Sequence, residues 1–140
     1  MSYIPAKLRD FVIERAGGCC EYCRVNLDYS DVAFHIEHVI AESHGGKTDE
    51  NNLALSCLRC NLYKGTNIAA ADPLTGEPTF LFHPRRQRWQ DHFQFNEAVI
   101  EPLTPEGRAT VFVLRVNDQE RVEERKLLLR FDRYPCPEPD

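Results

Sequence analysis

Two cysteine pairs constrain this chain more strongly than any other feature of its sequence. Cys20-x-x-Cys23 and Cys57-x-x-Cys60 each have two residues between their thiols, and 33 residues separate the pairs. A two-residue gap allows one tight turn to supply two of the four sulfurs that surround a zinc ion at about 2.3 Å. We therefore expect one zinc ion to join a turn near residue 20 to the start of a helix that follows residue 57.

Three alternatives to this zinc site stay open at the level of sequence. Cys19 could replace Cys20 as the first ligand, and the four thiols could instead be buried free cysteines or a redox pair. The separation of the pairs exceeds the roughly 15–20 residues of a simple zinc ribbon, which leaves room for an inserted hairpin. Cys136 lies in the proline-rich segment 135–140, which we expect to be a frayed tail that binds nothing.

Length and charge limit the classes of protein to which the chain can belong. With 140 residues it is expected to form one domain, or a small domain with an extension. Residues 18–68 alone have little apolar mass and would need a staple such as a metal ion. The net charge of -5 excludes a broadly basic surface, so any contact with nucleic acid must come from a local basic patch.

The first 18 residues contain no long apolar run, so we expect no signal peptide and no membrane association. The expected compartment is therefore the cytoplasm, which is reducing. In such a compartment closely spaced cysteines are metal ligands more often than disulfide partners.

Hydrophobic periodicity and turn residues predict the local structure. We expect helices over residues 5–16 and 118–131, a turn running into a helix over 53–71, a helix or strand over 104–117, a strand entering a second strand or a bend over 32–42, a short strand over 79–84, and a hairpin over 92–103. Loops are expected at 43–52 and 72–78 because of their glycine, asparagine and proline content.

The segment "FHIEHVIAESHGG", residues 34–46, concentrates three histidines and two glutamates between the cysteine pairs. Charged runs usually form solvated surface. Four cysteines around zinc leave no open position for chemistry, so these side chains are available for another task.

These residues resemble a known family. "CEYC", "EHVIAESHGG" and "NNLALSCLRCNLYKG" keep the order and spacing of the zinc-stapled HNH endonuclease motif over residues 19–66. The resemblance implies an α+β fold: a small ββα-metal, treble-clef-like finger over residues 19–68, preceded by an N-terminal helix over 1–18. Residues 69–140 would form an extension with a hairpin and a helix, similar to the tail of small stand-alone bacterial HNH proteins common in cyanobacteria.

The resemblance also implies roles for five residues. His38 would be the general base that activates water, and Glu37 would be a direct ligand of a divalent cation, Mg²⁺ or Mn²⁺. Asn61 would be the second ligand of this cation, and Asn52 would hold the loop that aims the histidine. Lys64 would contact phosphate. The chemistry is reasonable, because a neutral histidine suits proton abstraction near neutral pH and hard cations prefer oxygen ligands.

Two other histidines in residues 34–46 have open roles. Strand alternation places His35 on the same face as Glu37, so it either supports that carboxylate or is solvated. His44 precedes Gly45-Gly46 and is interpreted as a loop residue.

A basic segment, "HPRRQRWQDH", provides the local positive charge. Arg85, Arg86 and Arg88 could contact phosphates while Trp89 stacks on a base. Alternatively, Trp89 packs in the core and the arginines pair with acidic side chains.

The sequence thus predicts a metal-dependent DNA endonuclease that hydrolyses phosphodiester bonds with a structural zinc and a catalytic cation. The alternative is a non-catalytic zinc module that binds nucleic acid or a protein. Cleavage of RNA, the target sequence and the oligomeric state are left open.

Overall fold

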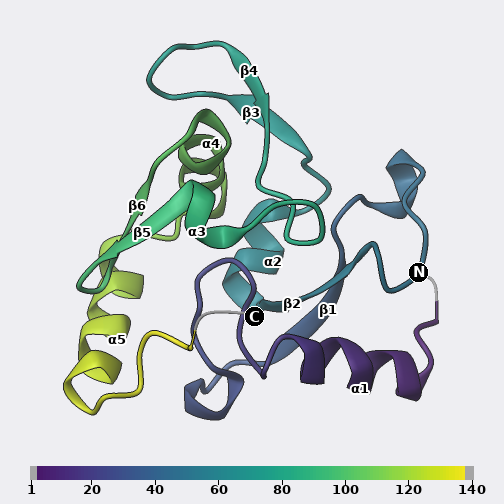
Figure 1. The fold of residues 1–140 in the computed structure, drawn as a ribbon, viewed down its shortest axis with the longest axis horizontal. Coiled ribbons are helices and arrows are strands. Elements are labelled where there is room, and N and C mark those ends of the chain that lie inside the picture. The colour runs from purple at the N-terminus through teal and green to yellow at the C-terminus, as the bar shows by residue number, and fades with distance from the viewer. Residues whose placement is uncertain (1–2, 138–140) are drawn as a thin grey trace.

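The computed structural model describes residues 3–137, which form a mixed α+β fold of short strand pairs and helices (Figure 1). The elements in chain order are α1 (Ala6–Arg15), β1 (Phe34–His38), β2 (Leu53–Cys57), α2 (Leu58–Lys64), β3 (Ala69–Ala71), β4 (Pro78–Phe80), α3 (Trp89–His92), β5 (Phe93–Asn96), β6 (Val99–Pro102), α4 (Pro105–Leu114) and α5 (Gln119–Arg130). Single 3₁₀ turns lie at Leu27–Tyr29 and Glu42–His44. The expected α+β class is confirmed.

The centre of the fold is a ββα unit. Strands β1 and β2 pair antiparallel, from Phe34 opposite Cys57 to His38 opposite Leu53. The chain passes from β2 directly into α2, which ends where Gly65 adopts a positive φ of 53°. Because α2 stops at Lys64, the expectation that this helix could continue to residue 71 is wrong.

Helix α1 covers one side of the β1–β2 pair and closes a small apolar core (Figure 1). Val12, Leu53 and Leu55 are almost completely buried there. A second, larger core surrounds the two cysteine pairs and includes Phe82 and Trp89. The ββα unit is therefore held between an N-terminal helix and the C-terminal extension.

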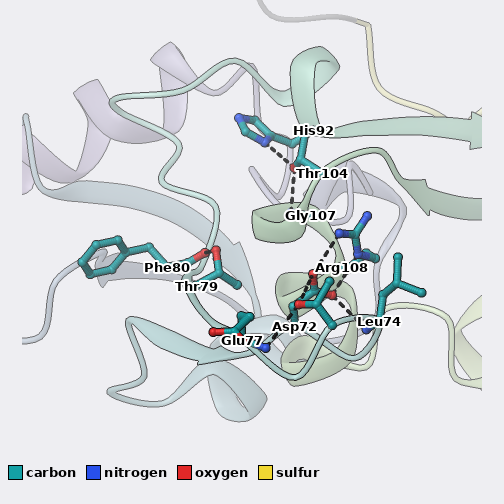
Figure 2. Close-up of polar contacts among 10 residues, drawn as sticks. Asp72, Leu74, Glu77, Thr79, Phe80, His92, Thr104, Gly107 and Arg108 are labelled. Carbon is teal, nitrogen blue, oxygen red and sulfur yellow. Dashed lines mark hydrogen bonds and ion pairs between the residues drawn. The ribbon is translucent and has the colours of Figure 1, made fainter.

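The extension contains two hairpins, β3–β4 and β5–β6, followed by α4 and α5. Figure 2 shows that Asp72 ties the β3–β4 hairpin to α4, because Arg108 donates two hydrogen bonds of 2.8 Å to its carboxylate. Thr104 caps α4 by accepting a hydrogen bond of 3.0 Å from the Gly107 amide. The segment 104–117, which the sequence left between helix and strand, is thus a helix up to Leu114.

The end of the described chain is not frayed. Cys136 forms a disulfide with Cys19, and Tyr134 is buried and donates a hydrogen bond of 2.7 Å to the Cys23 carbonyl. The expectation of a frayed segment that binds nothing is therefore wrong for residues 135–137; residues 138–140 lie outside the described part of the chain. Within residues 3–137, no helix is long and apolar enough to cross a membrane.

Candidate metal centre and nuclease site

Four buried cysteines meet in a single cluster. The cysteine cluster consists of Cys20, Cys23, Cys57 and Cys60. Their sulfur atoms all lie within 4.8 Å of one another, and the sulfurs of Cys23 and Cys57 are 3.8 Å apart. A tetrahedral site with 2.3 Å zinc–sulfur bonds has sulfur–sulfur edges of about 3.8 Å. The cluster therefore fits a zinc ion, and Cys19, which is in the disulfide, is not part of it.

The backbone around the cysteine cluster prepares it for a metal. The amides of Cys23 and Cys60 point at the sulfurs of Cys20 and Cys57, at 3.5 and 3.4 Å. Burial raises the pKa of the Cys20 and Cys60 thiols well above the ordinary value. Buried thiols of this kind would lose their protons to solvent when a cation binds the resulting thiolates, so metal binding and folding are coupled here.

Arg121 on α5 contacts the cysteine cluster. Its Nη2 lies 3.0 Å from the sulfur of Cys60, and its Nη1 donates a hydrogen bond of 2.7 Å to the Leu114 carbonyl. Arg121 as a whole is 5% exposed. It therefore offsets part of the negative charge that four thiolates would bring, and it ties the C-terminal helix to the metal site.

Glu37 lies at the end of β1 and points into the protein. Its side chain is 3% exposed, accepts a hydrogen bond from the hydroxyl of Tyr22, and has Lys64 Nζ at 3.6 Å from its Oε2. Burial raises the pKa of this carboxyl, while the Lys64 ammonium opposes that shift. Glu37 is thus a buried carboxylate with a partner on each oxygen.

Lys64 does not reach solvent. Its Nζ donates a hydrogen bond of 2.8 Å to the Val39 carbonyl in addition to pairing with Glu37, and its side chain is 2% exposed. The structure therefore does not support the expected phosphate contact of Lys64. The physical reason is that a buried carboxylate next to it requires a counter-charge.

His38 lies next to Glu37 in sequence but has other partners. Its Nε2 is 2.8 Å from the hydroxyl of Thr48 and 3.5 Å from Oε1 of Glu42, and its side chain is 16% exposed. Neighbouring strand residues point to opposite faces. The imidazole is therefore half-buried against the loop that follows β1, while Glu37 is held by α2 and the first cysteine turn.

Asn52 fixes the loop that carries Glu42 and Thr48, the two partners of His38. Its Oδ1 accepts a hydrogen bond of 2.9 Å from the Ile40 amide, and its Nδ2 donates to the carbonyls of Ile40 and Lys47, also at 2.9 Å. Gly46 is required at this crossing, because a Cβ there would lie 1.7 Å from the Ile40 carbonyl oxygen. Asn52 therefore holds the backbone at Ile40 and at Lys47 in place, and these are the two ends of the loop beside His38.

Asn61 lies on α2, one turn before Lys64, and is partly exposed. Among residues 3–137 its side-chain amide has no hydrogen-bond partner. It is therefore available as an oxygen ligand on the helix whose last residue holds Glu37.

The basic segment divides into buried and exposed residues. Arg85 pairs with Glu21, whereas Arg86 and Arg88 are exposed. Trp89 is 6% exposed, and its Nε1 donates a hydrogen bond of 2.8 Å to the Tyr22 carbonyl. The interpretation of Trp89 as a core residue is confirmed, and its ring is not available for stacking on a base.

His44 and His35, the other two histidines of residues 34–46, differ in their surroundings. His44 is an exposed loop residue, as expected. His35 lies opposite Ser56 in the strand pair, and its Nε2 is buried without a hydrogen-bond partner among the described residues. The Nε2 atom of His35 is therefore not solvated, although the residue is partly exposed, and among the described residues His35 makes no hydrogen bond to Glu37.

Sequence reasoning missed Tyr22, Thr48 and Arg121, which hold Glu37, His38 and the cysteine cluster respectively. Tyr22 lies between Cys20 and Cys23 in "CEYC", and this position could have indicated that its side chain lies close to the site. Nothing in the spacing of Thr48 or Arg121 pointed to their partners.

Comparison with known proteins agrees with this geometry. A family model described as HNH endonuclease matches residues 20–67. Residues 20–67 are thus similar to HNH endonuclease domains. The match begins at Cys20 and ends just beyond α2, so it coincides with the first cysteine turn and the ββα unit.

A curated relative extends the similarity beyond the residues that match the HNH model. The chain is 25% identical over 120 residues to the Septu protein PtuB of Bacillus thuringiensis. The aligned region covers 84% of this chain and 44% of that protein. The chain thus spans less than half the length of this relative.

Proposed function

We propose that this protein is a divalent-cation-dependent endonuclease that hydrolyses phosphodiester bonds in DNA. The observation that carries the proposal is the placement of His38 and Glu37 at the end of β1, inside the HNH-like segment whose strands and helix are stapled by the cysteine cluster. In this proposal residues 19–68 are the nuclease core, and residues 1–18 and 69–140 support it.

His38 is the general base of the proposed reaction. A half-buried imidazole takes a proton from water as the water attacks phosphorus. Thr48 and Glu42 orient the ring through Nε2, and Asn52 keeps their loop in place. Histidine tautomers follow the hydrogen bond that the other ring atom makes, so this loop also decides which nitrogen accepts the proton.

Glu37 and Asn61 are the residues that would hold a catalytic Mg²⁺ or Mn²⁺. Both offer oxygen atoms, which hard cations prefer, and the Asn61 amide has no partner among the described residues. When bound, such a cation stabilises charge on the phosphoryl and leaving oxygens. The ammonium of Lys64 favours the ionised form of the Glu37 carboxyl and so opposes the effect of burial.

A non-catalytic zinc module is the second candidate function. The observation that favours it is that both oxygens of Glu37 already have partners, Tyr22 and Lys64. Such a module would bind nucleic acid or a protein through the exposed Arg86 and Arg88 without using His38.

Nicking of supercoiled plasmid by zinc-loaded protein, with Mg²⁺, Mn²⁺ or a chelator of both, separates the two candidates. The nuclease proposal requires cation-dependent nicking that falls by about 10²- to 10⁴-fold in His38→Ala, the usual contribution of a general base. His44→Ala is the matched control, because His44 is exposed in the same segment. Binding of DNA without nicking, or equal nicking by wild type and His38→Ala, would favour the second candidate.

A further inference from the structure

A cavity lined by arginines lies outside the residues proposed for catalysis. Its volume is about 820 Å³. Charged side chains around it come from α1, the first cysteine turn and the 84–90 segment: Arg15, Arg24, Arg85, Arg88 and Glu21. Glu37, His38 and Asn61 do not line it.

The charge of this cavity is opposite to that of the whole chain. Four guanidinium groups face one carboxylate in the cavity, whereas the chain carries a net charge of -5. Burial and the nearby guanidinium of Arg85 both lower the pKa of Arg15, so these two cations lie close enough to repel each other. An excess of positive charge that is partly desolvated favours an anionic ligand.

Two of the arginines that line the cavity are anchored by hydrogen bonds to backbone carbonyls. Arg15 is anchored by donating to the carbonyls of Glu50 and Leu53 at 2.8 and 2.7 Å. Arg24 is anchored in the same way by the Pro137 carbonyl, at 2.7 Å. These two guanidinium groups are therefore fixed in place before any ligand arrives.

Arg85 and Arg88 have donors to offer. Arg85 gives its Nη2 to Glu21, but its Nη1 is buried with no hydrogen-bond partner in the described part of the chain. The side chain of Arg88 is exposed and makes no hydrogen bond within residues 3–137. A buried unpaired donor is costly, so a shift of the Arg85 side chain toward an anionic ligand would stabilise the complex by satisfying Nη1.

We propose that this cavity binds the terminal phosphate of a nucleotide, either free or at the end of a nucleic-acid strand. A terminal phosphate carries nearly two negative charges and three acceptor oxygens, and guanidinium groups bind it with paired hydrogen bonds. Arg24, which lines the cavity, is only 5% exposed, so a small phosphate group can approach it better than the continuous backbone of a duplex. The site is independent of catalysis by His38.

Trp89 provides a direct probe, because it is the only tryptophan in the chain and it lines the cavity. Titration with dAMP, without divalent cations, is expected to change its fluorescence saturably, whereas deoxyadenosine is expected to have no effect. A short single strand with a 5′-phosphate, compared with the same strand ending in a 5′-hydroxyl, tests the second source of phosphate. Saturable binding of either phosphate compound, with weak binding of its phosphate-free counterpart, supports the site.

Variants assign the binding to the cavity. Arg88→Gln is expected to weaken binding by about tenfold or more, as loss of a charge-assisted hydrogen bond does. It should fold normally, because Arg88 is exposed and unbonded among the described residues. Arg85→Lys keeps a positive charge beside Glu21 and is expected to give a similar loss, whereas Arg9→Gln, on the exposed face of α1, is the control.

Two results would overturn the proposal. One is the absence of a phosphate-dependent change in fluorescence with both dAMP and the 5′-phosphorylated strand. The other is binding that Arg88→Gln and Arg85→Lys leave unchanged. Either result can occur whether or not the protein nicks plasmid, so it is distinguishable from failure of the proposed nuclease activity.

Discussion

The ammonium group of Lys64 lies 3.6 Å from Oε2 of Glu37, and the two side chains are only 2% and 3% exposed. This pair joins the last residue of α2 to the end of β1. The cysteine cluster holds the first turn of the same helix. The helix is therefore fixed at both ends against the strand that carries the proposed catalytic residues.

Replacing Lys64 by methionine tests the value of this pair. Loss of one partner of a buried ion pair leaves an uncompensated charge, so we expect Lys64→Met to lower the free energy of unfolding by about 3–5 kcal/mol. Urea denaturation of the zinc-loaded protein measures this change. Lys126→Met is the control, because Lys126 pairs with Glu123 on the exposed surface at 3.4 Å and its loss should cost less than about 1 kcal/mol. Equal unfolding midpoints for both variants would contradict the structural role given to Lys64.

The assignment of the zinc ligands leads to a second prediction. Cys20 belongs to the cysteine cluster, whereas Cys19 forms the disulfide with Cys136. Elemental analysis is therefore expected to find one zinc per chain in wild type and in Cys19→Ser, and less than one in Cys20→Ser. Cys20→Ser should also lose its cooperative thermal transition, because metal binding and folding are coupled. Full zinc content in Cys20→Ser would require a different first ligand.

Local sequence patterns were sufficient for several of the regular elements. Helices α1 and α5 and the β5–β6 hairpin lie where periodicity and turn residues placed them, because these signals depend on neighbours a few residues apart. Three alanines at 69–71 favour a helix by propensity, yet they form β3 because they pair with β4 across a turn. Pairing in the folded protein overrode the local preference there.

Acid stability provides a third prediction. The two hydrogen bonds from Arg108 hold the pKa of Asp72 well below its ordinary value of 3.8. A lowered folded-state pKa contributes stability that is present above the ordinary value and is lost as pH falls below it. We expect Asp72→Asn to lower the melting temperature near neutral pH, and the difference from wild type to shrink as pH falls from about 5 to about 3.

The control for this titration is Asp91→Asn. Asp91 is exposed on α3, and its side chain has no hydrogen-bond partner in residues 3–137. Its substitution should change the melting temperature little, because it removes no hydrogen bond among the described residues. A difference for Asp72→Asn that stays constant over this range of pH would show that the Asp72–Arg108 contact does not titrate with folding.

DNA binding should depend strongly on salt if Arg86 contacts phosphate. Arg86 is exposed and lies in the basic segment, so Arg86→Gln is expected to reduce the slope of log affinity against log salt by about 1. Fluorescence anisotropy with labelled duplex between about 50 and about 200 mM salt measures this slope. Arg130→Gln, exposed on α5, is the control. Affinity that does not change over this range would remove Arg86 as a phosphate contact.

The sequence was a poor guide where contacts join distant residues. Lys64 was expected to face phosphate, but its bond to Val39 spans 25 residues and directs it inward. The fate of Cys136 depends on Cys19, which lies 117 residues away. Neither pairing leaves a periodic signal, since each results from how α2 and the C-terminal segment dock on the first cysteine turn. The loop-holding role of Asn52 was easier to predict from the sequence, because its partners Ile40 and Lys47 belong to the same short motif.

Chemical rescue of His38→Gly tests the proposed function most directly. If His38 is the general base, plasmid nicking by the zinc-loaded variant should be about 10²- to 10⁴-fold slower than wild type, and added imidazole should restore part of the lost rate. The restored rate should rise with pH as the free imidazole loses its proton. Nicking by His38→Gly at the wild-type rate, or a slow rate that imidazole leaves unchanged while zinc content and melting temperature match wild type, would contradict this role.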